Sequence, residues 1–217
     1  AENGYQLIHI TDYEWKHKQE IIKSIISSKL GCNKKIWARK CNAKKITDSK
    51  IIRDFLEKNH IQGYSPSSHY YGLYNNDNLF MVLTVGKNRF GSGLEIHRYA
   101  TQNGITIVGG ASKLLKYFIK DANPEKILTY CEIDKSNGNL YESLGFSRIK
   151  TTQPGYFWTN GNIILSRYKT QKKNLHKILP TFDPNLSETQ NMKKWGYQQY
   201  WNCGNYVYCL DMKKGTP

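Results

Sequence analysis

The amino-acid sequence predicts a mixed α/β fold in which helices cover both faces of one sheet. Between residues 94 and 150 the patterns follow the order strand, glycine turn, helix, strand, helix and strand, which is typical of α/β folds. Hydrophobic residues make up 39% of the 217 residues and aromatic residues 13%, which is enough for a packed core. No apolar run approaches the roughly 18 residues that a membrane-spanning helix needs.

Residues 1–45 are predicted to form an appendage in front of the main domain. The segment LIHITDYEW alternates like the end of a strand, and EWKHKQEIIKSIISSKLG follows as an amphipathic helix that stops at Gly31. Residues 33–45 then contain six Lys or Arg and no acidic residue, with Trp37 among them. This composition favours a connector or strand that lies along a phosphate backbone, although an exposed basic connector without a partner has the same composition.

From residue 46 onwards the main domain is expected. A helix begins at Thr47 or Asp48 and ends near Asn59 or His60. After a loop, residues 69–90 form a hairpin that turns at NNDN, and LEIHRYAT is the next strand.

The central motifs continue the same order. The apolar run ITIV leads through a Gly-Gly turn into a helix whose residues Leu114, Leu115 and Phe118 face inward, and KILTYCEI is the following strand. The segment NGNLYESLGF is a short helix with Gly145 as its C-terminal cap. The strands in FSRI, GYFWTN and NIILSRYK are expected to complete the sheet.

The C-terminal part, within a main domain of residues 46–217, is predicted to be a basic and aromatic extension. Residues 148–177 contain seven Lys or Arg and no acidic residue. A short helix is expected around Glu188 to Lys194, followed by an aromatic hairpin that turns at Asn202 to Asn205.

The charge balance points to a polyanionic partner. Lys and Arg number 32 against 17 Asp and Glu, which gives a formal net charge of +15. DNA is the leading candidate, because each cation that neutralises a phosphate releases counterions; a basic surface that serves solubility is the alternative. The candidate nucleic-acid contacts are Lys34, Lys35, Arg39, Lys40, Arg167, Lys169, Lys172 and Lys173.

The five cysteines are expected to be reduced thiols. They form no CxxC pair, so metal-knuckle spacing is absent and no metal site is predicted. A cytoplasmic location fits this pattern. Cys131 lies within a predicted strand and is expected in the core.

The motifs IVGGASKLL, LTYCEI and NGNLYESLGF, in this order, resemble the acyl-CoA N-acyltransferase superfamily known as GNAT. In that family a strand runs into a loop of the form Q/R-x-x-G-x-G/A at a helix start, where backbone N–H groups bind the pyrophosphate of coenzyme A. Thr106, Gly109 and Ala111 occupy the matching positions, with Thr106 in place of Arg or Gln and Asp134 where an Asn often contacts the cofactor. The resemblance implies a mostly antiparallel mixed sheet, acetyl-CoA or another acyl-CoA as cofactor, and cofactor contacts from Val108, Gly109, Gly110, Ala111, Ser112, Lys113 and Asn137.

The sequence resembles a phage subgroup of this superfamily more closely than the superfamily as a whole. FLEKNHIQG, HYYGLY, TVGK, the pair Glu95 and Arg98, VGGASKLLKYF, TYCE and SNGNLYESLGF follow in its order over roughly residues 36–210. These proteins resemble the domain found C-terminal to homing-endonuclease or Vsr-like nucleases and, more distantly, the DNA-modifying protein Mom. The resemblance implies DNA as partner and an upstream nuclease domain, of which residues 1–45 would be the tail.

The resemblance also implies catalytic residues. Tyr141 would stand near the thioester sulfur and protonate the leaving thiolate, while Glu95 would be the general base, with Arg98 as an alternative. Glu95 and His97 are expected on one face of their strand and Arg98 on the other. A structural ion pair is the alternative role for Glu95 and Arg98. His60 is a further candidate base, and its alternative role is to cap the preceding helix.

Two functions follow from these observations. One is transfer of an acyl-derived group to a nucleobase amine, in which case an open gap is expected between the strands at Glu95 and Tyr130, where coenzyme A enters in family members. The other is a catalytically inactive DNA-binding module that targets a homing endonuclease.

Overall fold

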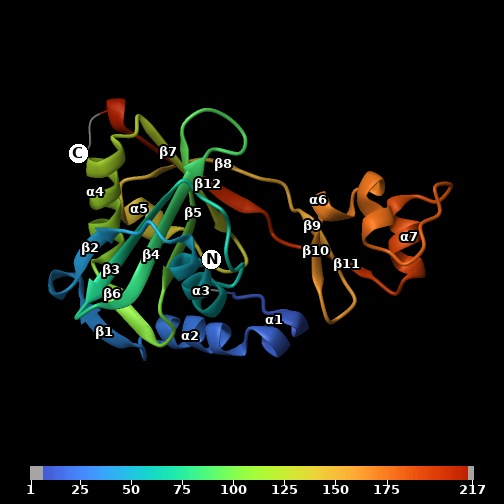
Figure 1. The fold of residues 1–217 in the computed structure, drawn as a ribbon, viewed down its shortest axis with the longest axis horizontal. Helices are drawn as coiled ribbons and strands as arrows, with labels where there is room; N and C mark the ends of the chain where they lie inside the picture. Colours follow the sequence, from blue (N-terminus) through green and yellow to red (C-terminus); the bar gives the residue numbers. More distant parts are fainter. Residues whose placement is uncertain (1–6, 215–217) are drawn as a thin grey trace.

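A seven-stranded mixed sheet forms the centre of the larger part of the molecule, at the left of Figure 1. The structure is a computed structural model that describes residues 7–214. The strand order is β2-β3-β4-β5-β7-β12-β8, and only β5 and β7 pair in parallel. The strands are β2 (Asn42–Lys45), β3 (His69–Asn75), β4 (Asn78–Lys87), β5 (Leu94–Thr101), β7 (Lys126–Glu132), β8 (Ser147–Thr151) and β12 (Asn205–Asp211). This confirms the predicted mixed, mostly antiparallel sheet.

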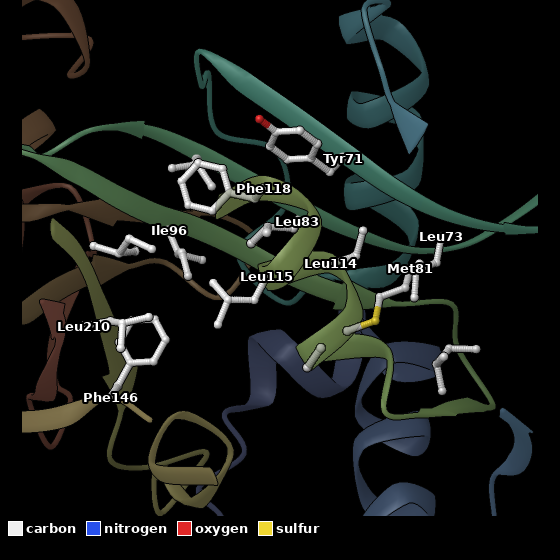
Figure 2. Close-up of a cluster of buried hydrophobic side chains, with 14 of the residues drawn as sticks. Tyr71, Leu73, Met81, Leu83, Ile96, Leu114, Leu115, Phe118, Phe146 and Leu210 are labelled. Carbon is white, nitrogen blue, oxygen red and sulfur yellow. The ribbon is translucent and has the colours of Figure 1, made fainter. Parts of the chain in front are cut away.

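Helices cover both faces of this sheet, as predicted. Helices α4 (Gly110–Ala122) and α5 (Asn139–Ser143) lie on one face, and α3 (Ser49–Asn59) lies on the other. Figure 2 shows how α4 places Leu114, Leu115 and Phe118 over the strands. The core on the α3 side is formed by Ile46, Ile52, Phe55, Leu56, Val82 and Ala100.

The N-terminal segment contains two helices, α1 (Asp12–His17) and α2 (Gln19–Lys29). The strand end expected before them is not formed in residues 7–11, and Thr11 instead caps α1 in a capping box with Glu14. Residues 1–6 of the predicted nuclease tail lie outside the described residues. Gly31 follows α2 with positive φ, as a helix stop requires.

The predicted boundary at residue 45 falls at the end of a strand of the main sheet. Strand β2 pairs with β3 from Asn42 to Lys45, and β1 (Lys34–Trp37) pairs in parallel with β6 (Ile105–Val108). The short helix η1 (Ala38–Lys40) connects β1 to β2. The basic segment 33–45 therefore contributes backbone to two sheets, and the division of the chain at residue 45 stays a prediction.

Residues 152–204 form a separate lobe between β8 and β12, at the right of Figure 1. It contains β9 (Tyr156–Thr159), β10 (Ile164–Ser166), α6 (Arg167–Thr170), η2 (Lys172–Lys177), α7 (Glu188–Lys194) and β11 (Gln198–Trp201). Its strands pair in the order β10-β9-β11, and its own core is formed by Trp158, Leu175, Leu179 and Met192. Residues 156–166 thus build this small sheet and do not complete the main one.

The predicted aromatic hairpin around Asn202 to Asn205 is wrong. Strand β11 pairs with β9 in the lobe, whereas β12 pairs with β7 and β8 in the main sheet. The basic and aromatic extension is therefore an insertion, and the chain returns to the main sheet after it. The helix predicted at Glu188 to Lys194 is confirmed, with Ser187 and Gln190 forming its capping box.

No helix within residues 7–214 is long and apolar enough to cross a membrane. All five cysteines are free thiols, and Cys131 is buried in the main core as predicted.

Candidate active site

The central strands β5 and β7 separate part-way along their length. Their parallel pairing is confined to Leu94–Ile96 of β5 and Ile127–Thr129 of β7. Beyond these residues both strands continue, to Thr101 and Glu132, without pairing to each other. The predicted opening between the strands is therefore present beside Tyr130, but on β5 it begins after Ile96, because Glu95 is still paired with Leu128.

A cavity of about 570 Å³ occupies this opening. The cavity is lined by both separated strands, the segment after α3 and one face of α5. Its lining residues include His60, Gln62, Arg89, Glu95, Arg98, Tyr99, Glu132 and Tyr141. A second cavity of about 600 Å³ adjoins it and shares Gln62, Arg89, Arg98 and Glu132. The second cavity opens towards the lobe.

A β-bulge in β5 changes the predicted directions of its side chains. Thr84 of β4 pairs with Arg98 and Val85 pairs with Ile96, so His97 is the extra residue. Ile96 and Tyr99, three residues apart, both contact the core under α4, while Ala100 contacts the core under α3. Arg98 therefore lies on the same side of the sheet as Glu95 and His97, not on the opposite side as alternation predicted.

Glu95 is fully buried and bonded to the loop between β4 and β5. Its carboxylate forms an ion pair with Arg89 and accepts hydrogen bonds from Arg89 Nε at 3.0 Å and from the Arg89 backbone N–H at 3.2 Å. The guanidinium also lies over the Tyr130 ring, 5.7 Å from its centroid. With these bonds Glu95 positions the loop and Arg89, and its role as general base stays a prediction.

Glu132, at the end of β7, is a carboxylate that was not among the residues predicted for the site. It is half-buried, it lines both cavities, and it accepts a hydrogen bond from the side chain of Gln62. Burial, and then the neighbouring Asp134, raise its pKa above the ordinary value for Glu. A carboxylate with a raised pKa in a cavity is suited to accept a proton. The available signal was the acidic pair in CEID at the end of a strand.

His60 lies at the edge of the same wall, just after α3. Its Nδ1 accepts a hydrogen bond from the backbone N–H of Gln62 at 3.1 Å. Burial, and then the charges of Arg98 and Lys18, lower its pKa to about 3, so the ring is neutral at physiological pH. Because Nδ1 accepts a bond, the ring proton is on Nε2, and His60 is a hydrogen-bond donor in this arrangement. Its imidazole caps no carbonyl of α3, whose C-cap bond is made by the His60 backbone N–H to Leu56.

Tyr141 reaches the cavity from α5, on the side of the sheet that α4 covers. Its ring contacts the rings of Phe146 and Tyr208, with centroids 5.7 and 5.5 Å away. Burial raises the pKa of its hydroxyl, an effect that Thr129 reduces. The hydroxyl is therefore protonated at neutral pH and can donate a proton. Tyr141 and Glu132 thus approach the opening from opposite sides of the sheet.

Several acetyltransferases of known structure are similar to this chain in fold. An acetyltransferase of Bacillus subtilis in complex with CoA has 15% sequence identity and a TM-score of 0.47, over 79% of this chain and 99% of that one. A spermidine N-acetyltransferase from Vibrio cholerae has 12% identity and a TM-score of 0.48, over 81% of this chain and 96% of that one. A GNAT family acetyltransferase from Elizabethkingia anophelis with acetyl-CoA bound has 12% identity and a TM-score of 0.42, over 79% of this chain and 98% of that one. No family model and no curated protein matches the chain.

The predicted cofactor-binding residues lie at the start of α4. Gly109 is exposed with a φ of 76°, and no side chain caps the helix, so N–H groups of the first turn are left for an anion. The Tyr99 hydroxyl, on the cavity wall, donates to the Ala111 carbonyl and so connects this turn to the cavity. These features fit a pyrophosphate.

Lys113 and Asn137 have other surroundings. Lys113 Nζ donates to the carbonyls of Ala38 and Cys41 and so ties η1 to α4. Asn137 is exposed in the turn before α5, where its side chain accepts a bond from the Asn139 backbone N–H. Residues 108–113 and Asn137 line neither cavity.

The predicted nucleic-acid residues are all exposed, and they fall into two groups. Those in residues 34–40 lie in β1 and η1, whereas those in residues 167–173 lie in the lobe, at the other end of the molecule in Figure 1. The two groups therefore do not form one continuous basic surface. Lys169 lines the second cavity, together with Phe157, Tyr200 and Trp201 of the lobe.

Proposed function

We propose that this chain is an N-acyltransferase that moves an acyl group from an acyl-coenzyme A to an amine of a nucleobase. The observation that supports the proposal most directly is the opening between β5 and β7. It has a carboxylate of raised pKa, Glu132, on one side of the sheet and a protonated phenol, Tyr141, on the other.

The residues have separate roles in this reaction. Bound acyl-coenzyme A supplies the acyl group as a thioester, with its pyrophosphate at the uncapped start of α4 near Gly109. Glu132 takes a proton from the acceptor nitrogen as that nitrogen attacks the thioester carbonyl, because the new N–C bond would otherwise leave the nitrogen positively charged. Tyr141 holds a proton that it can give to the departing sulfur. Gln62 fixes the orientation of the Glu132 carboxylate through its hydrogen bond.

Charge and aromatic side chains support a nucleic acid as the carrier of the amine. The net charge is +15, and the cavity beside Glu132 is lined by cations of the main domain and by aromatic rings of the lobe. Exposed rings such as Trp201, 60% exposed, can stack on an unpaired base. A base in a duplex has to be flipped out to reach such a site. Membership of a phage subgroup beside a nuclease is part of this proposal and is supported by the motif order alone.

Titration calorimetry with acetyl-CoA tests the enzyme directly. We expect binding, and release of free coenzyme A thiol when an adenine-containing or cytosine-containing single strand is added. No heat of binding at millimolar acetyl-CoA would refute the proposal.

A DNA-binding module without chemistry is the second candidate. It is favoured by the commitment of Lys113 to two backbone carbonyls and by the absence of residues 108–113 from the cavity walls. This candidate predicts DNA affinity that falls steeply with salt, unaffected by acetyl-CoA.

A further inference from the structure

Arg98 is a half-buried cation whose charge is not neutralised by an ion pair. Its Nε donates to the Gly63 carbonyl at 3.0 Å and a terminal nitrogen donates to the His97 carbonyl at 2.7 Å. Among residues 7–214, no carboxylate forms a salt bridge with it. A guanidinium has five N–H donors, so donors remain on a side chain that lines both cavities.

A second guanidinium, that of Arg89, lines the same two cavities. Its side chain is 56% exposed, although Glu95 and Tyr130 fix its position. Burial, and then the charge of Arg89, lower the pKa of Arg98, while the carboxylates of Glu132, Glu95 and Glu57 raise it and so offset part of the repulsion between the two cations. An anion between them would relieve this repulsion.

Three of the acidic groups near the two arginines have partners, whereas Asp134, which also lines the second cavity, has one buried carboxylate oxygen without a hydrogen-bond partner among the described residues. Glu95 is paired with Arg89, and Glu14 is paired with Lys135 at 2.9 Å. Glu132 has a raised pKa and a bond from Gln62. Lys18 and Lys169 add positive charge to the wall of the second cavity.

We propose that Arg98 and Arg89 bind a phosphoryl group of the acceptor substrate, with Glu95 as the residue that positions Arg89. Guanidinium groups suit this role because their planar forks match phosphate oxygens. The inference rests on the proposed function, and it restricts the acceptor to a phosphate-bearing molecule. A free nucleotide and a single-stranded nucleic acid supply the same phosphoryl chemistry.

The test measures binding without cofactor, by fluorescence anisotropy of an end-labelled single-stranded oligodeoxynucleotide of about ten nucleotides. Deoxyadenosine monophosphate and inorganic phosphate serve as competitors. Two variants leave the net charge at its wild-type value: Arg98→Lys, and the double variant Arg89→Gln with Glu95→Gln. The double variant removes both members of the ion pair together, so that the buried Glu95 carboxylate is not left unpaired.

Arg148→Gln is the matched control. Arg148 is exposed beside the Tyr206 ring, 4.7 Å from its centroid, and lines neither cavity. We expect each cleft variant to weaken binding by about tenfold, the loss expected for a charge-assisted hydrogen bond, and the control to change it by less than about twofold.

If the mononucleotide and phosphate displace the probe, and their competition weakens in the cleft variants, the source is a free nucleotide. If only the oligonucleotide responds, the source is a nucleic-acid chain. Unchanged affinity in both cleft variants overturns the proposal, and so does an equal loss in Arg148→Gln, because that result means unspecific attraction. Failure of acetyl-CoA binding leaves this result untouched, so the two proposals fail separately.

Discussion

Replacing Gly138 by Ala should destabilise the protein far more than replacing Gly145 by Ala. The two glycines flank α5 and have nearly the same backbone, with φ of 86° and 87°. A Cβ at position 145 meets only Leu210 Cδ1 at 3.9 Å, an ordinary contact. A Cβ at position 138 falls well inside 3.0 Å of the Tyr208 hydroxyl. The pair therefore separates backbone strain from a steric clash.

The magnitudes follow from these contacts. Positive φ costs an Ala about 1–2 kcal/mol, which is the whole expected loss for Gly145→Ala. Gly138→Ala also has to displace the buried Tyr208 hydroxyl, which donates to Glu142 at 2.9 Å, and a buried polar group that loses its partner costs about 1–3 kcal/mol more. We expect Gly138→Ala to lose about 2–5 kcal/mol in total.

Urea unfolding followed by circular dichroism measures both variants. The comparison is valid if the slopes of the two transitions agree with that of the wild type, because the slope reports the surface exposed on unfolding. Equal losses in the two variants would refute the reasoning, since they would show that Tyr208 moves aside at no cost. Gly138→Ala should also lower activity, because α5 positions Tyr141.

Three further predictions concern the candidate site and the lobe. Glu132→Gln should abolish acyl transfer and leave the affinity for acetyl-CoA, measured by calorimetry, unchanged. The rate of the wild type should rise with pH through the pKa of Glu132, which lies above the ordinary pKa of Glu. Folding raises the pKa of Glu132, so this residue favours the folded state at a pH below the ordinary pKa of Glu and loses that contribution as the pH rises through its pKa in the folded protein. Glu132→Gln should therefore be more stable than the wild type at neutral pH, but not at a pH below the ordinary pKa of Glu. Tyr141→Phe should lower the rate by about 10²-fold or more while the fold is kept, as stopped-flow thiol detection would show; an unchanged rate would exclude it as the acid. Charge reversal at Lys172 and Lys173 should weaken DNA binding in a filter assay, and unchanged affinity would mean that this part of the lobe is not the contact.

Local sequence signals were enough for the helices of the main domain. Asp48 before α3, and Gly109 and Gly145 beside α4 and α5, have the conformations that their residue types favour at helix ends. The signal is reliable because a cap depends on only a few neighbouring residues. The same holds for the turn at Asn76 and Asp77, which have positive φ.

Strand partners and side-chain directions could not be predicted in the same way. Alternation identifies β11 and β12 as strands but does not say that they pair in different sheets, because pairing depends on residues far away in the chain. The bulge at His97 is invisible for the same reason, since it is defined only against β4. Arg98 was therefore predicted on the wrong face of the sheet. Glu132 was not predicted as a base, because Gln62, which bonds to it, is far away in the sequence.

The lobe leaves and rejoins the main sheet at one point. Thr151 of β8 is paired with Tyr206 of β12, and the backbone N–H of Thr152 donates to the Asn205 carbonyl at 2.8 Å. The two ends of the insertion are thus already neighbours, and a short turn could close the sheet without it. Residues 152–204 can therefore vary as one unit without altering strand β7, which carries Glu132, or helix α5, which carries Tyr141.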